Sequence, residues 1–175
     1  MQTKPQKPRG GIGTKKSLSN SQVLEPNEIR DEVFRRLKSY DKLNLLEQFA
    51  MFMGKAQILE MGFKNLLSSL YDYDIEKIEK WTLGRTVREL KECGLRPDFI
   101  QLLESVVDYR NYIAHDLLVD DAMIRNFTGG DSGRLVIKHL QHGIYELEQV
   151  MFLHDWCEDH DAWSSASLEV AQKGA

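Results

Sequence analysis

Residues 41–70, DKLNLLEQFAMFMGKAQILEMGFKNLLSSL, contain a long amphipathic pattern. Their apolar residues recur at spacings of three and four, which is the periodicity of one face of an α-helix. The stripe consists of Leu45, Phe49, Phe52, Ala56, Leu59, Phe63, Leu66 and Leu70. Asp41 is a residue type that caps helix N-termini, and the pattern continues to about Ser69. We predict one long helix here, with an apolar face wide enough to pack on both sides.

The neighbouring segments have helical patterns of their own. Upstream, after Pro26, a short amphipathic helix is predicted by Ile29, Val33, Phe34 and Leu37. Downstream, YDYDIEKIEK (71–80) indicates a break followed by a short turn of helix. In the next segment Thr82 resembles an N-cap, and Gly94 resembles the residue that follows a helix C-terminus.

Two more helices complete the predicted fold. Pro97 is placed in the first turn of a helix that continues to about residue 116. The glycine-rich connector TGGDSGR (128–134) then leads into a last long helix over about 134–160, through Leu140, Ile144, Leu147, Met151 and Phe152. The connector fits neither GxGxxG nor a P-loop, so we assign it no phosphate-binding role. The sum is an all-α fold, an antiparallel bundle of four to five helices with two long antiparallel partners.

Charge and apolar patterning together divide the chain into three parts. Residues 1–24 carry five Lys and Arg residues and no acid, against a net charge of −4 for all 175 residues. We interpret residues 1–25 as a flexible basic leader, 26–162 as the helical domain and 163–175 as a flexible tail. A basic leader can also tether nucleic acid, but no aromatic residue is interleaved with its charges, which favours the simpler interpretation.

The composition is that of a globular protein, with 42% hydrophobic and 29% charged residues. No run of 18 apolar residues is present, so we expect no membrane-spanning helix. The basic N-terminal segment lacks the apolar stretch of a signal peptide. Two cysteines, Cys93 and Cys157, do not make a disulfide framework. These features predict a cytoplasmic location.

The stretch VVDYRNYIAHDLL (106–118) places polar residues inside an apolar helical pattern. Asp108, Asn111 and His115 stand at positions i, i+3 and i+7, so they share one helix face with Arg110 at its edge. The opposite face carries Leu102, Val106, Ile113 and Leu117. Buried charge is costly unless it is paired. We therefore expect this polar face to meet a partner subunit and not the core of its own chain.

Spacing alone does not make this motif significant. With ten Arg and five His residues, about one Arg–His pair at such a separation is expected by chance. Arg134 and His139 have the same spacing and serve as an internal comparison. Arg110 differs from Arg134 because a polar residue, Asn111, follows it and because it lies in the middle of a helix.

RNYIAH (110–115) resembles the signature of HEPN domains, in which an Arg, usually followed by a polar residue, precedes a His with four to six residues between them. The order of helices over about 28–160 is also similar to that family. The resemblance implies a metal-independent endoribonuclease, often a toxin or defence effector, with RNA as its substrate and an antitoxin protein as a further partner. We also expect a homodimer, because one helix supplies only one Arg and one His. One toxin subgroup has a Tyr two places after the His, where this chain has Leu117.

The residue chemistry fits RNA cleavage. His115 has a side chain suited to act as general acid or base, and Arg110 offers forked donors to a charged phosphate. Asn111 can fix the tautomer of the His or contact phosphate. A two-fold dimer would bring two such sets to one groove. Asp108, Glu60 and Lys64 are candidate supporting residues, although polar lines such as Gln57, Glu60 and Lys64 are more often solvated faces.

Three alternatives stay open. Arg110 could pair with Glu60 or Asp108 while His115 is a satisfied interior histidine. The chain could be a non-catalytic HEPN-like module that binds a partner. It could also be a helical transcriptional or stress regulator unrelated to HEPN proteins. HDWCEDH (154–160) lacks a fourth zinc ligand, so we expect neither a metal ion nor a cofactor.

Overall fold

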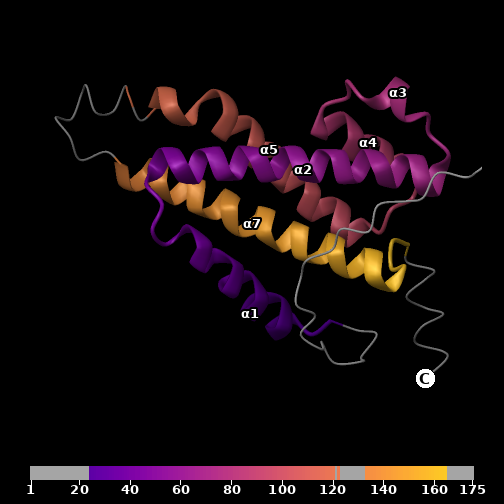
Figure 1. Cartoon of the computed structure of the whole chain (residues 1–175), viewed down its shortest axis with the longest axis horizontal. Helices are drawn as coiled ribbons and strands as arrows, with labels where there is room; N and C mark the ends of the chain where they lie inside the picture. The colour runs from indigo at the N-terminus through magenta and orange to yellow at the C-terminus, as the bar shows by residue number, and fades with distance from the viewer. Residues whose placement is uncertain (1–23, 121, 123–132, 165–175) are drawn as a thin grey trace, which may run out of the picture.

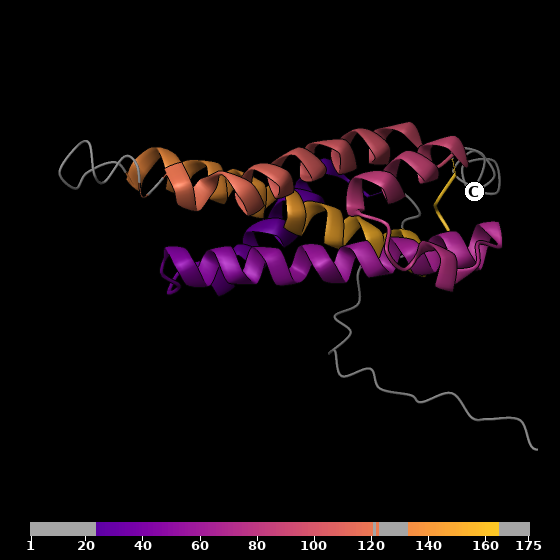
Figure 2. The same cartoon turned by 90° about the horizontal axis from the view of Figure 1, so that it is seen from above.

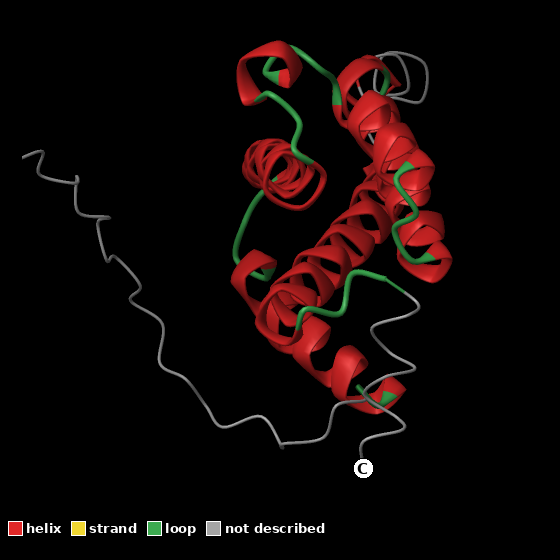
Figure 3. Cartoon of the chain, turned by 90° about the vertical axis from the view of Figure 1, so that its right-hand side faces the viewer, coloured by secondary structure: helices red, strands yellow, loops and turns green. Residues whose placement is uncertain are grey.

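The computed structural model describes residues 24–120, 122 and 133–164, without the side chains of 133–135. The chain forms helices α1 (Pro26–Leu37), η1 (Lys38–Tyr40), α2 (Leu45–Tyr71), α3 (Ile75–Ile78), α4 (Leu83–Glu92), α5 (Pro97–His115) and α7 (Gly133–His160). Every described element is helix or loop (Figure 3). The predicted all-α bundle is confirmed.

Helix α7 is the centre of the bundle. It packs against α1, α2 and α5, and Figure 2 shows it running between α2 and α5. The core contains large side chains from α2, α4, α5 and α7, among them Phe52, Phe63, Leu90, Leu103, Ile144 and Leu147. α2 also packs against α4 and α5. The prediction that its apolar face has neighbours on both sides is therefore confirmed.

The two longest helices run in the same direction (Figure 1). The contacts establish this, because Lys55 of α2 reaches Glu148 of α7, and Gly62 of α2 lies beside His154. Helix α5 is antiparallel to α7, because Arg96 lies near Cys157 while Ile113 lies at Gly143. The prediction that the two long helices are antiparallel partners is wrong, since α5 returns the chain along the bundle before α7 begins.

Local capping explains most helix ends. Thr82 accepts a hydrogen bond from the Arg85 amide, as predicted for an N-cap, and Gly94 follows α4 with φ of +86°. Asp41 does not cap α2. Asn44 does so instead, and its side chain and that of Glu47 bond each other's backbone amides. The helix also continues past Ser69 to Tyr71.

Residues just outside both predicted boundaries of the helical domain are packed against it. Residues 1–23 and 165–175 are outside the described part of the chain, but Leu24 already packs against the core and Glu25 caps α1. Trp163, which the predicted boundary places in the tail, is buried against Phe99. The helical domain therefore includes Leu24, Glu25 and Trp163, which the predicted boundaries of 26 and 162 leave outside it. Among the described helices, none has the length and apolarity needed to cross a membrane.

Candidate functional site

Helix α5 presents the RNYIAH motif near its C-terminal end. Its buried side consists of Phe99, Ile100, Leu103, Val106 and Ile113. The helix continues without a break to His115, and the Asp116 amide donates to the Tyr112 carbonyl oxygen at 2.8 Å. Because one side of the helix is fixed in the core, residues on the other side are held in a defined order on the surface.

The polar side of α5 faces outward. Asp108, Asn111 and His115 are all exposed, and Arg110 is half-buried beside them. Arg110 Nη1 donates to Asn111 Oδ1 at 3.4 Å. No carboxylate in the described residues lies within ion-pair distance of Arg110. The alternative in which Arg110 pairs with Glu60 or Asp108 and His115 is interior is therefore wrong.

Glu60 and Lys64 belong to a different part of the molecule. Lys64 is only 3% exposed, and its ammonium group donates to Glu60 Oε1 at 2.8 Å and to the Glu79 carbonyl oxygen at 2.7 Å. These bonds connect α2 to the end of α3. The solvated face predicted around Lys64 is therefore wrong, and none of the described contacts joins this pair to the motif.

Gly143 allows α7 to approach the motif segment closely. A Cβ atom at this position would lie 2.8 Å from Ile113 Cδ1 and 3.3 Å from Tyr109 Cβ. Contacts that short force neighbouring atoms to move. Gly143 therefore sets the distance between α7 and the motif. Sequence reasoning missed this role, although an isolated glycine inside a helical pattern is a signal of close packing.

His139, the histidine of the Arg134–His139 pair with the same spacing as the motif, also lies beside α5. The His139 ring on α7 packs 5.4 Å from the Tyr112 ring, centroid to centroid. The Tyr112 hydroxyl donates to Asp120 Oδ2 at 2.9 Å. The pKa of Tyr112 is raised, mainly because the hydroxyl is partly buried and secondly because of this hydrogen bond. The side chain of Arg134 is outside the described residues, as is the connector that precedes it. Because His139 packs against Tyr112, a residue of the motif, its substitution could disturb the motif itself, so His139 is not an independent control for His115.

A buried charged cluster connects η1, α2 and α7, and sequence reasoning did not find it. Glu148 is 1% exposed and accepts hydrogen bonds from the Tyr40 hydroxyl, at 2.6 Å, and from Lys55 Nζ. Lys55 also lies 5.0 Å above the Tyr40 ring. Burial and the neighbouring carboxylate raise the Tyr40 pKa far above its usual value. This cluster has all its partners inside the protein, so we assign it a structural role.

The HDWCEDH segment has packing partners instead of the geometry of a metal centre. His154 packs between the rings of Phe63 and Trp163, and His160 stacks on Trp156. Cys157 is buried, which raises the pKa of its thiol to about 11. Within the described residues, no three His, Cys, Asp or Glu side chains are placed to hold a metal ion.

Comparison with known proteins does not assign the chain to a family. No family model, curated protein or solved structure gives a significant match to it.

Proposed function

We propose that this protein is a metal-independent endoribonuclease of HEPN type, with its site on the polar face of α5. The observation that carries the proposal is the exposure of Asn111 and His115, with Arg110 beside them and free of any described carboxylate partner. A charged side chain that needs no internal partner remains available for a phosphate.

The proposed reaction needs an acid, a base and a cation. A histidine removes the proton from the ribose 2′-hydroxyl, and the 2′-oxygen attacks the neighbouring phosphorus. The bond from phosphorus to the 5′-oxygen breaks, and that oxygen is protonated as it leaves. Arg110 would stabilise the negative charge that develops on the phosphate in the transition state. The products are a 2′,3′-cyclic phosphate and a free 5′-hydroxyl.

One protomer supplies only part of this set. Arg110 and His115 are about 140° apart around the helix axis and about 7.5 Å apart along it. Two exposed carboxylates, Asp108 and Asp116, lie close to the motif in sequence and oppose phosphate binding. A two-fold dimer with paired α5 helices would supply two arginines and two histidines to one groove.

The same carboxylates favour a second candidate function. A helical module of this fold without catalytic activity would use the exposed face of α5 to bind a protein partner, such as an antitoxin or a regulated enzyme. Asp108 and Asp116 would then contact a basic surface on that partner. The two functions differ in whether the isolated chain cleaves RNA.

The deciding experiment is cleavage of a labelled single-stranded RNA by the full chain in EDTA. We expect cleavage products ending in 2′,3′-cyclic phosphate, and a dimer mass by light scattering of the same sample. Arg110→Ala should lower the cleavage rate about a hundredfold, as expected for loss of a transition-state donor. Arg88→Ala, an exposed arginine on α4, should leave the rate unchanged. Failure to cleave, or cleavage that stops in EDTA, would exclude the proposed mechanism.

A further inference from the structure

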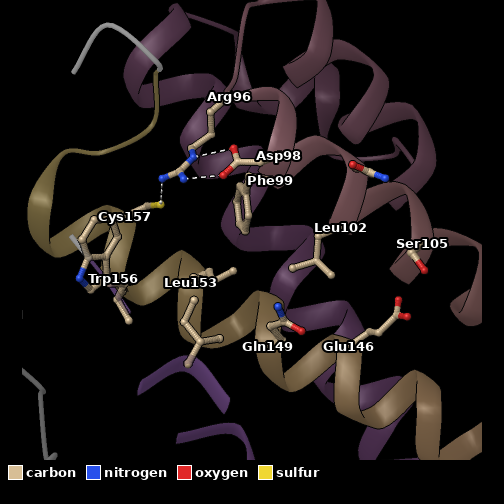
Figure 4. A pocket seen from close by; sticks show the side chains of 13 residues that line it. Arg96, Asp98, Phe99, Leu102, Ser105, Glu146, Gln149, Leu153, Trp156 and Cys157 are labelled. Atoms are coloured by element: carbon tan, nitrogen blue, oxygen red, sulfur yellow. Dashed lines mark hydrogen bonds and ion pairs between the residues drawn. The ribbon is translucent and has the colours of Figure 1, made fainter. Parts of the chain in front are cut away.

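A pocket of about 600 Å³ lies between the first half of α5, the second half of α7 and the start of α1. This volume is in the range of small-molecule sites. Figure 4 shows Leu102 and Ser105 on α5 opposite Glu146, Gln149 and Leu153 on α7. The pocket is separate from the RNYIAH motif, none of whose six residues lines it.

One part of the lining is apolar and suits a flat hydrophobic group. Leu102 and Leu153 face each other across the pocket, and Trp156 closes one end of it (Figure 4). The Trp156 ring is itself held in place, because His160 stacks on it with ring centroids 4.5 Å apart. A rigid aromatic wall loses little conformational entropy when it contacts a ligand.

The charged residues at the Trp156 end are already paired. Arg96 donates to both carboxylate oxygens of Asp98, at 2.8 and 2.6 Å, and approaches the Ala162 carbonyl oxygen at 3.4 Å. The pKa of Asp98 is accordingly lowered by its bond to Arg96. Because Arg96 is neutralised, the pocket offers no free cation to an anionic ligand.

Glu146 differs from these groups. Its Oε2 atom is buried and has no hydrogen-bond partner among the residues that the structure describes. A buried acceptor without a donor is unfavourable, and charged acceptors are the most costly. Since Arg96 and Asp98 balance each other, the Glu146 carboxylate leaves the pocket with one uncompensated negative charge.

We propose that this pocket binds a small amphipathic amine. The protonated amine donates a hydrogen bond to Glu146, with Gln149 and Ser105 nearby as further polar groups. The apolar body of the ligand packs between Leu102 and Leu153 and against Trp156. This inference is independent of the ribonuclease proposal, because it uses the first half of α5 and a set of residues separate from the motif.

The test uses the full chain and three probes of the same shape: 2-naphthylmethylamine, 2-naphthylmethanol and 2-naphthoate. Binding is followed by NMR of the three tryptophan indole signals, with Trp156 assigned from Trp156→Phe. We expect the amine to shift the Trp156 signal with a Kd of about 100 μM, a realistic affinity for so small a ligand. The amine should bind at least tenfold tighter than the alcohol, as expected for a charge-assisted hydrogen bond, and the naphthoate should not bind.

Glu146→Gln preserves the shape of the pocket and removes its charge. This variant should reduce the preference for amine over alcohol to about twofold or less, while Glu158→Gln, an exposed glutamate on the same helix, should keep the preference. Ser105→Trp, which fills the pocket, should abolish binding of both probes. The proposal is overturned if no probe binds, if amine and alcohol bind equally, or if the preference survives in a folded Glu146→Gln protein.

Discussion

Two polar clusters, one joining η1, α2 and α7 and the other on α5, differ in where their partners are. Glu148 is buried, and it receives hydrogen bonds from Tyr40 and Lys55 inside the protein. Arg110 and His115 lie at the surface, and the one described bond of Arg110 is to its neighbour Asn111. Burial of an unpaired charge costs free energy of folding, whereas an exposed, unpaired set is available to a ligand without that cost. This contrast is why we assign a structural role to the first cluster and propose a functional role for the second.

The largest effect on stability is expected from removing the buried carboxylate. Glu148→Ala leaves the Tyr40 hydroxyl and Lys55 without their acceptor, and should lower the free energy of unfolding by about 3 kcal/mol. This value is at the low end of the range of about 3–5 kcal/mol for removing one partner of a buried ion pair, because the Lys55 side chain is partly exposed to water. Urea denaturation measures this difference.

An exposed ion pair provides the matched control. Lys91 and Glu104 are bonded at 2.7 Å, but both side chains are at least half exposed. Glu104→Ala should therefore cost less than about 1 kcal/mol in the same urea measurement. Equal costs for the two substitutions would show that the Glu148 cluster is not a structural element.

A smaller effect is expected where α7 meets the motif. Gly143→Ala places a methyl group against Ile113 and Tyr109, and should destabilise the protein by about 1–2 kcal/mol. Gly54→Ala in α2 meets no atom within 4 Å and should stabilise it by about 0.5–1 kcal/mol, since alanine favours helix. Thermal unfolding shifts of opposite sign would support the packing role of Gly143, and shifts of the same sign would contradict it.

Helix faces were mostly predictable from sequence, because periodicity reports which side of a helix is buried, although Phe34 and Leu70 of the predicted stripes are exposed. The pattern identified Phe52, Leu59 and Phe63 as core residues, and it separated Asn111 and His115 from the buried side of α5. Local signals also located Thr82, Gly94 and Pro97 correctly. Residue type alone predicted Asp41 as the cap of α2, but Asn44 also accepts hydrogen bonds from backbone amides and is the residue that caps the helix.

Relations between distant segments were not predictable. Periodicity does not reveal the direction of a helix in the bundle, so the parallel arrangement of α2 and α7 was missed. The Lys55–Glu148 pair joins residues 93 positions apart, and the burial of Lys64 depends on the Glu79 carbonyl oxygen. No local pattern encodes either contact. The unpartnered oxygen of Glu146 likewise becomes visible only when α5 and α7 are packed together.

The most direct test of the account is the RNA cleavage rate of His115→Ala beside that of His142→Ala. Both histidines are exposed, but only His115 belongs to the polar face of α5. Each variant must first keep the melting curve and the mass of the wild type. We predict a loss of about a hundredfold or more for His115→Ala, the range for a positioned acid or base, and no loss for His142→Ala. A well-folded His115→Ala protein that cleaves RNA as fast as the wild type would contradict the catalytic assignment.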